Sequence, residues 1–106
     1  MPKYLLEAKY TADGLKGLLK DGGSKRRQAA TNAIKSVGGK LESFYYAFGG
    51  TDVFAILEAP DHVSMSAAAL AIGSTGAVTV KTIVLITPEE IDQAAKKVVT
   101  YKAPGQ

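Results

Sequence analysis

The stretch KLESFYYAFGGTDVFAILEA, from Lys40 to Ala59, decides the fold. Residues Lys40 to Phe48 alternate in character as a half-buried strand does, and Val53 to Ala59 form a second strand-like segment. The four residues between them, Gly49-Gly50-Thr51-Asp52, have the composition of a hairpin turn. The stretch therefore predicts two antiparallel strands joined by a short connection.

The segments before this hairpin predict one strand and one long helix. Residues Tyr4 to Tyr10 alternate as a strand. Residues Thr11 to Gly23 hold a short apolar patch between glycine-containing turn signals, which favours a single helical turn inside a long loop. Ser24 is a suitable N-cap for a helix that Gly38 and Gly39 end.

The segments after the hairpin predict a helix, a strand and a final helix. Asp61 caps a helix that reaches about Thr75, and residues 78–86 are a β-branched strand. Thr87 caps a last helix that begins at Pro88. The face of the middle helix expected to pack inward consists of Val63, Ala67, Leu70 and Ala71.

The element order is β-α-β-β-α-β with a C-terminal helix, which is the ferredoxin-like arrangement of the α+β class. Residues 1–100 are expected to form a single domain and residues 101–106 a tail. Helices cover one face of such a sheet, so strand residues divide between a covered and an open face. The side chains assigned to the open face are Leu5, Glu7, Lys9, Glu42, Phe44, Tyr46, Phe48, Phe54, Ile56, Glu58, Lys81, Ile83 and Leu85.

The aromatic and aliphatic content of that open face predicts an interface. A monomer does not normally leave so large an apolar area in water. Two such sheets packed face to face form a dimeric α+β barrel, so a homodimer or a higher even oligomer is expected. The C-terminal helix could double that assembly again.

Composition excludes several classes of site. The chain has 106 residues, no cysteine and one histidine, His62, so thiolate chemistry and multi-histidine metal cages are excluded, and neither a metal nor a cofactor is expected. No apolar run is long enough to cross a membrane and no signal peptide is expected, which predicts a cytoplasmic protein.

The net charge of +3 conceals two halves of opposite sign. Residues 1–40 carry nine bases and three acids, whereas residues 41–95 carry seven acids and one base, Lys81. Such halves attract each other or a second copy. Only Lys25, Arg26 and Arg27 are clustered, so no nucleic-acid partner is expected.

Three side chains are candidates for chemistry. Asp52 follows the glycine turn, where it either stabilises the hairpin or acts as a general base or polar anchor at a cavity mouth. Lys81 lies mid-strand and is either paired with Glu7, Glu42 or Glu58, or desolvated and available as a base. Tyr46 is either a core residue or a phenol lining a pocket, as are Tyr10 and Tyr45.

Two further features have a structural and a functional interpretation. Gly23, Ser24, Lys25 and Arg26 combine a helix N-terminus with bases, which suits an anion but equally a solvated helix start. His62, beside the Asp61 cap, is expected to be exposed to solvent rather than to act as a ligand.

Three segments resemble the GYD-domain family, which is assigned to the dimeric α+β barrel superfamily. They are MPKYLLEAKYTADGLKGLLKDGGSKRR, GGKLESFYYAFGGTDVFAILEAPD and GAVTVKTIVLITPEEID. The Gly-Tyr-Asp motif of the family falls on Gly50-Thr51-Asp52, with threonine in place of tyrosine. The superfamily includes cofactor-free monooxygenases, isomerases, haem enzymes and ligand-sensing domains, so the resemblance implies a pocket between sheets without choosing a chemistry.

The leading functional hypothesis is a binding module for a small organic ligand with an apolar body and an anionic or polar end. The ligand-binding residues expected are Phe44, Tyr46, Phe48, Phe54 and Lys81. Two alternatives stay open: a cofactor-independent oxygenase or isomerase in the same cavity, and an assembly protein without a pocket.

Overall fold

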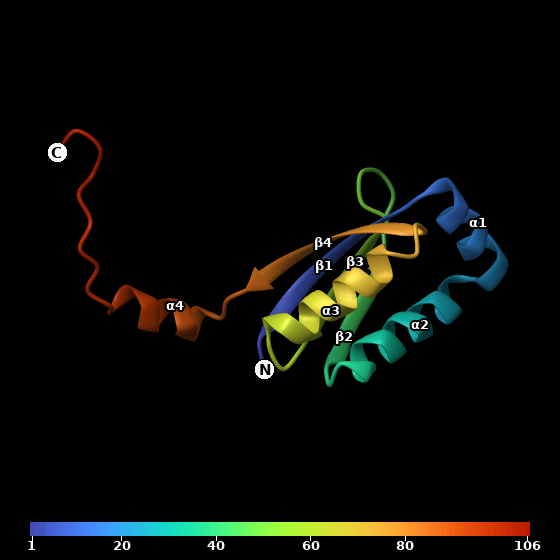
Figure 1. The fold of residues 1–106 in the computed structure, drawn as a ribbon, viewed down its shortest axis with the longest axis horizontal. Coiled ribbons are helices and arrows are strands. Elements are labelled where there is room, and N and C mark those ends of the chain that lie inside the picture. Colours follow the sequence, from blue (N-terminus) through green and yellow to red (C-terminus); the bar gives the residue numbers. More distant parts are fainter.

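The computed structural model describes residues 1–106 and has an α+β fold with one four-stranded antiparallel sheet (Figure 1). The elements in chain order are β1 (Lys3–Tyr10), α1 (Ala12–Asp21), α2 (Gly23–Ser36), β2 (Lys40–Tyr46), β3 (Val53–Glu58), α3 (His62–Gly73), β4 (Val78–Leu85) and α4 (Pro88–Ala95). The strand order is β2-β3-β1-β4. This order is that of a ferredoxin-like fold and confirms the predicted class.

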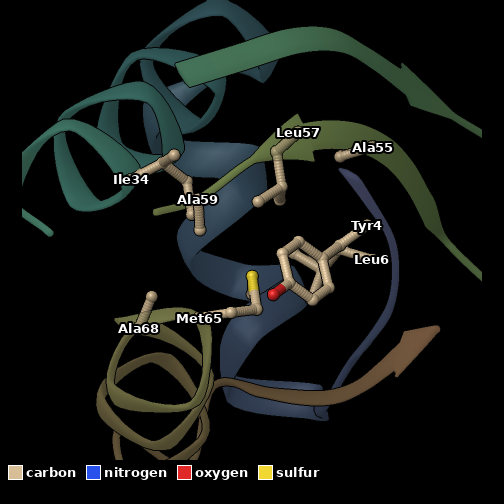
Figure 2. Close-up of a cluster of buried hydrophobic side chains, with 8 residues drawn as sticks. All are labelled: Tyr4, Leu6, Ile34, Ala55, Leu57, Ala59, Met65 and Ala68. Atoms are coloured by element: carbon tan, nitrogen blue, oxygen red, sulfur yellow. The ribbon is translucent and has the colours of Figure 1, made fainter. Parts of the chain in front are cut away.

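The core lies between the sheet and helices α2 and α3. Figure 2 shows side chains of β1 and β3 pointing toward side chains of the two helices. Leu57 and Tyr4 from the strands and Ile34 from α2 are almost completely inaccessible to solvent. The full cluster consists of Tyr4, Leu6, Ile34, Ala55, Leu57, Ala59, Met65 and Ala68.

Helix α3 buries a different face from the one predicted. Met65 and Ala68 are buried, whereas Val63 and Leu70, which were expected to pack inward, are 79% and 74% exposed. The helix has no charged residue after His62 and is apolar on every side. Hydrophobic periodicity marks a buried face only when the opposite face is polar, so the pattern here could not distinguish the two.

Strand β2 contains a β-bulge that reverses the predicted facing of its second half. Leu41 pairs with Leu57 and Ser43 pairs with the next residue of β3, Ile56, so Glu42 has no partner of its own. An extra residue of this kind shifts the alternation by one position. Phe44 therefore packs against the core under the helices, and Tyr45 takes its place on the open face.

Residues 12–21 form a full ten-residue helix, α1, and not a loop with one helical turn. The Thr11 hydroxyl caps the helix by accepting from the backbone N–H of Gly14 at 3.2 Å. The same hydroxyl donates to the Gly76 carbonyl at 2.8 Å, and the backbone N–H of Thr11 donates to the Ala77 carbonyl at 2.9 Å. These bonds fix the start of α1 against the loop that precedes β4.

The prediction of a loop over residues 11–23 was wrong because Gly14 was interpreted as a turn signal. In the structure this glycine lies inside α1, where the missing side chain permits close packing. A Cβ built on Gly14 would overlap the Ala77 carbonyl oxygen and lie 2.9 Å from the Tyr10 ring. The glycine is buried and allows α1 to approach the sheet end closely.

Helix α2 begins two residues earlier than predicted. Its N-cap is Gly22, at φ +84°, and Ser24 lies inside the first turn without capping the helix. Gly22 thus joins α1 directly to α2, and its positive φ suits a residue without a side chain.

Helix α4 has the predicted start but no packing against the body. Thr87 and Glu90 form a reciprocal capping box, in which the Thr87 hydroxyl accepts from the Glu90 N–H and the Glu90 carboxylate accepts from the Thr87 N–H. Figure 1 shows α4 beyond the end of β4, projecting away from the other helices, and none of its residues is buried. No helix of the chain is both long and apolar enough to span a membrane.

Substitution of Gly14 tests the close approach of α1. We expect Gly14→Ala to lower the free energy of unfolding by about 1–3 kcal/mol, because the new methyl group forces α1 away from the Ala77 carbonyl. Gly17→Ala is the matched control, since no atom lies within 4 Å of its added Cβ. The control should be neutral or stabilising by up to about 1 kcal/mol. Urea denaturation measures both, and equal effects would contradict this account of Gly14.

Candidate ligand-binding site at the end of the sheet

A pocket of about 320 Å³ lies where the ends of β1 and β2 meet helix α1 and the β2–β3 turn. Eight residues line this pocket, and six of them are hydrophobic. The lining residues are Tyr10, Leu15, Leu18, Gly23, Tyr46, Ala47, Phe48 and Asp52. The pocket therefore combines an apolar wall with two phenols and one carboxylate.

Tyr46 reaches the pocket because of the bulge in β2. After Glu42 the strand turns Tyr46 to the helix side, where its phenol donates to the Gly23 carbonyl of α2 at 3.1 Å. Burial raises the pKa of Tyr46 to about 12, the neighbouring Tyr10 phenol adds to the rise, and Arg26 and Arg27 oppose it. The phenol is therefore neutral at physiological pH and acts as a hydrogen-bonding group.

Asp52 fastens the hairpin turn to the end of β1. Its Oδ2 accepts from the backbone N–H of Tyr10 at 2.8 Å, and its own N–H donates to the Ala8 carbonyl at 2.9 Å. The Asp52 carbonyl accepts from the Ala47 N–H at 2.8 Å. The structural interpretation of Asp52 is thus confirmed, and the same carboxylate also borders the pocket.

Both leucines of the apolar wall come from α1, the helix that the sequence did not predict. Leu15 and Leu18 of α1 line the pocket together with Phe48, whose side chain is fully exposed to solvent beside the turn. The signal was present in the sequence, because Thr11 is a cap and Leu15, Leu18 and Leu19 recur at helical spacing. Asp13 and Gly14 next to the cap were instead interpreted as a turn.

The five predicted ligand-binding residues separate into three places. Tyr46 and Phe48 line the pocket, and Phe44 packs into the core between the sheet and α2. Phe54 and Lys81 lie on the open face, each directly opposite Glu7 of β1. The predicted set was therefore wrong in placing all five on one face, because the bulge turns Phe44 and Tyr46 away from the other two.

The open face presents its side chains in rows across the sheet. Ile56, Leu5 and Ile83 form one apolar row across β3, β1 and β4. The next row places Glu7 between Phe54 and Lys81. The two charged residues are neighbours in the strand register, but no ion pair joins Lys81 to Glu7, Glu42 or Glu58.

Polar groups border these rows at both ends of the sheet. The Thr51 hydroxyl, at the position of the motif tyrosine, donates to Glu7 at 3.4 Å. At the other end Lys3 forms an ion pair of 2.9 Å with Glu42. The hydrogen bond from Lys3 lowers the pKa of Glu42, and the same contact raises the pKa of Lys3.

The candidate anion-binding residues do not converge. Gly23 and Ser24 border a shallow depression with Arg27 and Tyr46, adjacent to the pocket. Arg26 turns to a small apolar slot of about 100 Å³ beneath α2 and lies 3.7 Å from Asp21. Lys25 is exposed.

His62 is exposed, as predicted, and has one protein partner. Its Nδ1 lies 2.6 Å from the hydroxyl of Tyr4, whose ring is buried in the core. The two rings meet edge to face with centroids 5.7 Å apart. No cluster of three or more His, Asp or Glu side chains is arranged to hold a metal ion.

The fold is that of a small α+β protein with one open sheet face, and its pocket at the sheet end is lined by residues of a single chain. The family model of the GYD domain matches residues 4–95, and the chain belongs to this family. No curated protein and no solved structure shows significant similarity to it. The family assignment confirms the resemblance seen in the sequence and leaves the function to the geometry of the site.

The raised pKa of Tyr46 allows a test of the partial desolvation of its phenol, whose residue is 39% exposed. The folded chain holds the phenolic proton more tightly than the unfolded chain, whose tyrosines titrate near 10.0. The stability contributed by this difference is complete below pH 10 and is lost as the pH rises toward 12. We expect the free energy of unfolding of Tyr46→Phe to fall less steeply over this pH range than that of the wild type. Urea denaturation at pH values between about 9 and 12 measures this difference.

Tyr101→Phe provides the control, because Tyr101 lies exposed in the C-terminal tail. Near-ultraviolet titration of phenolate should lose its highest-pH component only in Tyr46→Phe. An unchanged titration in that variant would contradict the partial desolvation of the Tyr46 phenol.

Proposed function

We propose that this protein binds a small organic molecule in the pocket at the end of the sheet. One observation carries the proposal: two phenols and a carboxylate meet an apolar wall around a volume of about 320 Å³. Pockets that bind small molecules are largely apolar and hold a few converging polar groups that orient the ligand.

The lining indicates the chemistry of the ligand. Leu15, Leu18 and Phe48 provide contacts for an apolar body such as a ring or a short chain. Asp52 has one oxygen engaged by the Tyr10 N–H, and its second oxygen has no hydrogen-bond partner in the protein. A polar end that donates a hydrogen bond, such as a hydroxyl, amide or amine, fits this carboxylate best.

The state of Tyr46 favours binding over acid–base catalysis. A general base works best with a pKa near the operating pH, whereas burial moves the pKa of Tyr46 away from it, to about 12. The phenol is already positioned by its hydrogen bond to Gly23. It therefore suits the recognition of a polar group more than the removal of a proton.

Binding of aromatic fragments tests the proposed site. We expect single-ring alcohols, amides and amines to raise the melting temperature and to shift the amide NMR signals of Tyr10, Leu18 and Phe48. Asp52→Asn keeps an acceptor for the Tyr10 N–H but removes the charge, and it should weaken amine binding about tenfold or more.

The matched control is Leu19→Ala, which changes an exposed leucine of α1 outside the pocket. Leu19→Ala should leave the affinity unchanged. Fragment shifts that cluster around Glu7 and Lys81 instead would contradict the site at the sheet end.

We also propose that the open sheet face joins two copies into a homodimer. The row of Ile56, Leu5 and Ile83 and the neighbouring Phe54 form a continuous apolar area on a face that no helix covers. Face-to-face packing would bury these side chains and place the Glu7 and Lys81 of each copy near the seam.

A charge on the edge strand tests the dimer. We expect Ile83→Glu to produce monomers, because it buries a carboxylate within the apolar row. Thr79→Glu is the matched control, since Thr79 lies on the same face of β4 beside Lys9 in the polar part of the sheet. Sedimentation equilibrium measures the mass, and a dimer that survives Ile83→Glu would contradict this interface.

A further inference from the structure

Helix α4 is an amphipathic helix without packing partners in its own chain. It follows β4 after only Ile86 and Thr87 and extends beyond the sheet (Figure 1). Ile91 is 53% exposed, Ala95 lies one turn further on the same side, and the exposed Val98 and Val99 come next. The apolar side of this arm, residues 87–99, is therefore open.

An isolated helix of this length is not stable in water. Helices shorter than about 12–15 residues are marginal without tertiary contacts, and α4 has eight residues. The capping box of Thr87 and Glu90 satisfies two backbone N–H groups at the start of the helix, which offsets only part of the cost of ordering it. The arm needs a surface on which Ile91 is buried.

The outward side of α3 is a surface of the required kind. Val63, Ala67 and Leu70 recur at i, i+4 and i+7 on the side opposite the buried Met65 and Ala68. Because α3 has no charged side chain after His62, an apolar helix can lie along it without burying a charge.

The arm cannot easily reach α3 of its own chain. Leu85, at the end of β4, lies opposite Lys3, and α3 begins at the same end of the sheet, where His62 meets Tyr4. The arm continues outward from that end (Figure 1). To lie along its own α3 it would have to reverse direction within two residues, one of which is the N-cap.

The charges of α4 and α2 favour packing of the arm on α3 of another copy. The first two turns of α4 carry Glu89, Glu90 and Asp92 and no base. Helix α2, which lies beside α3 in the helix layer, carries four bases and no acid: Lys25, Arg26, Arg27 and Lys35. A helix that packs on α3 therefore places acidic residues next to a basic neighbour.

We propose that the arm of one copy packs on the outward side of α3 in a second copy, with Ile91 against Leu70 and the acids toward α2. A reciprocal exchange of two arms would give a closed, two-fold symmetric contact. The outward side of α3 and the open sheet face lie on opposite sides of the body. The arm contact is therefore separate from the proposed sheet-face dimer and would join two such dimers.

Because the chain has no cysteine, site-directed disulfides give a clean test. We mix full-length Leu70→Cys with isotope-labelled full-length Ile91→Cys, oxidise gently and measure mass without reduction. We expect a mixed disulfide that joins one labelled and one unlabelled chain. Gln93→Cys replaces Ile91→Cys in the control, since Gln93 lies on the opposite side of α4 and should give several times less mixed product.

Two results would overturn the inference. Equal yields from the Ile91 and Gln93 variants would mean random collisions. An internal disulfide as the main product of the Leu70→Cys, Ile91→Cys double variant in one chain would mean that the arm folds onto its own body. The mixed disulfide should persist when both partners also carry Ile83→Glu, so failure of the sheet-face dimer and failure of the arm contact are distinguished.

Discussion

The β-bulge at Glu42 is the constraint on which the arrangement of the site depends. Without it, the alternation of β2 would turn Phe44 and Tyr46 to the open face and Tyr45 toward the helices. Burial of a phenylalanine is worth up to about 3 kcal/mol, and Phe44 contacts both core clusters beneath the helices. This packing of Phe44 offsets the pairing lost at Glu42, which lies on the edge strand β2.

The same bulge separates two surfaces that the sequence suggested were one. Tyr46 leaves the open face and joins Asp52 and Phe48 at the sheet end, while Phe54 remains beside Glu7. The pocket is therefore complete within a single chain. The proposed ligand site and the proposed dimer face are therefore separate surfaces, since no lining residue of the pocket belongs to the apolar row of Leu5.

The strands, the hairpin and two helix caps were predictable because each depends on neighbours in the sequence. The Asp61 side chain accepts from the Ser64 N–H at 2.7 Å, and Thr87 forms its capping box, as their positions indicated. The bulge, the buried face of α3 and the role of Gly14 were not predictable in this way. Each is decided by contact with a segment far away in the chain, such as the Ala77 carbonyl beside Gly14.

Half of the candidate site followed from the sequence for the same reason. Tyr46, Phe48 and Asp52 were singled out as aromatic or acidic residues near a turn, and they do meet. Their partners Leu15 and Leu18 come from α1, whose helical character was hidden by the glycine that lets it pack closely. Gly14 thus both obscured the pocket wall in the sequence and positions that wall in the fold. A glycine beside an N-cap and an apolar i, i+3 pair is consequently better interpreted as a packing contact of a helix than as its end.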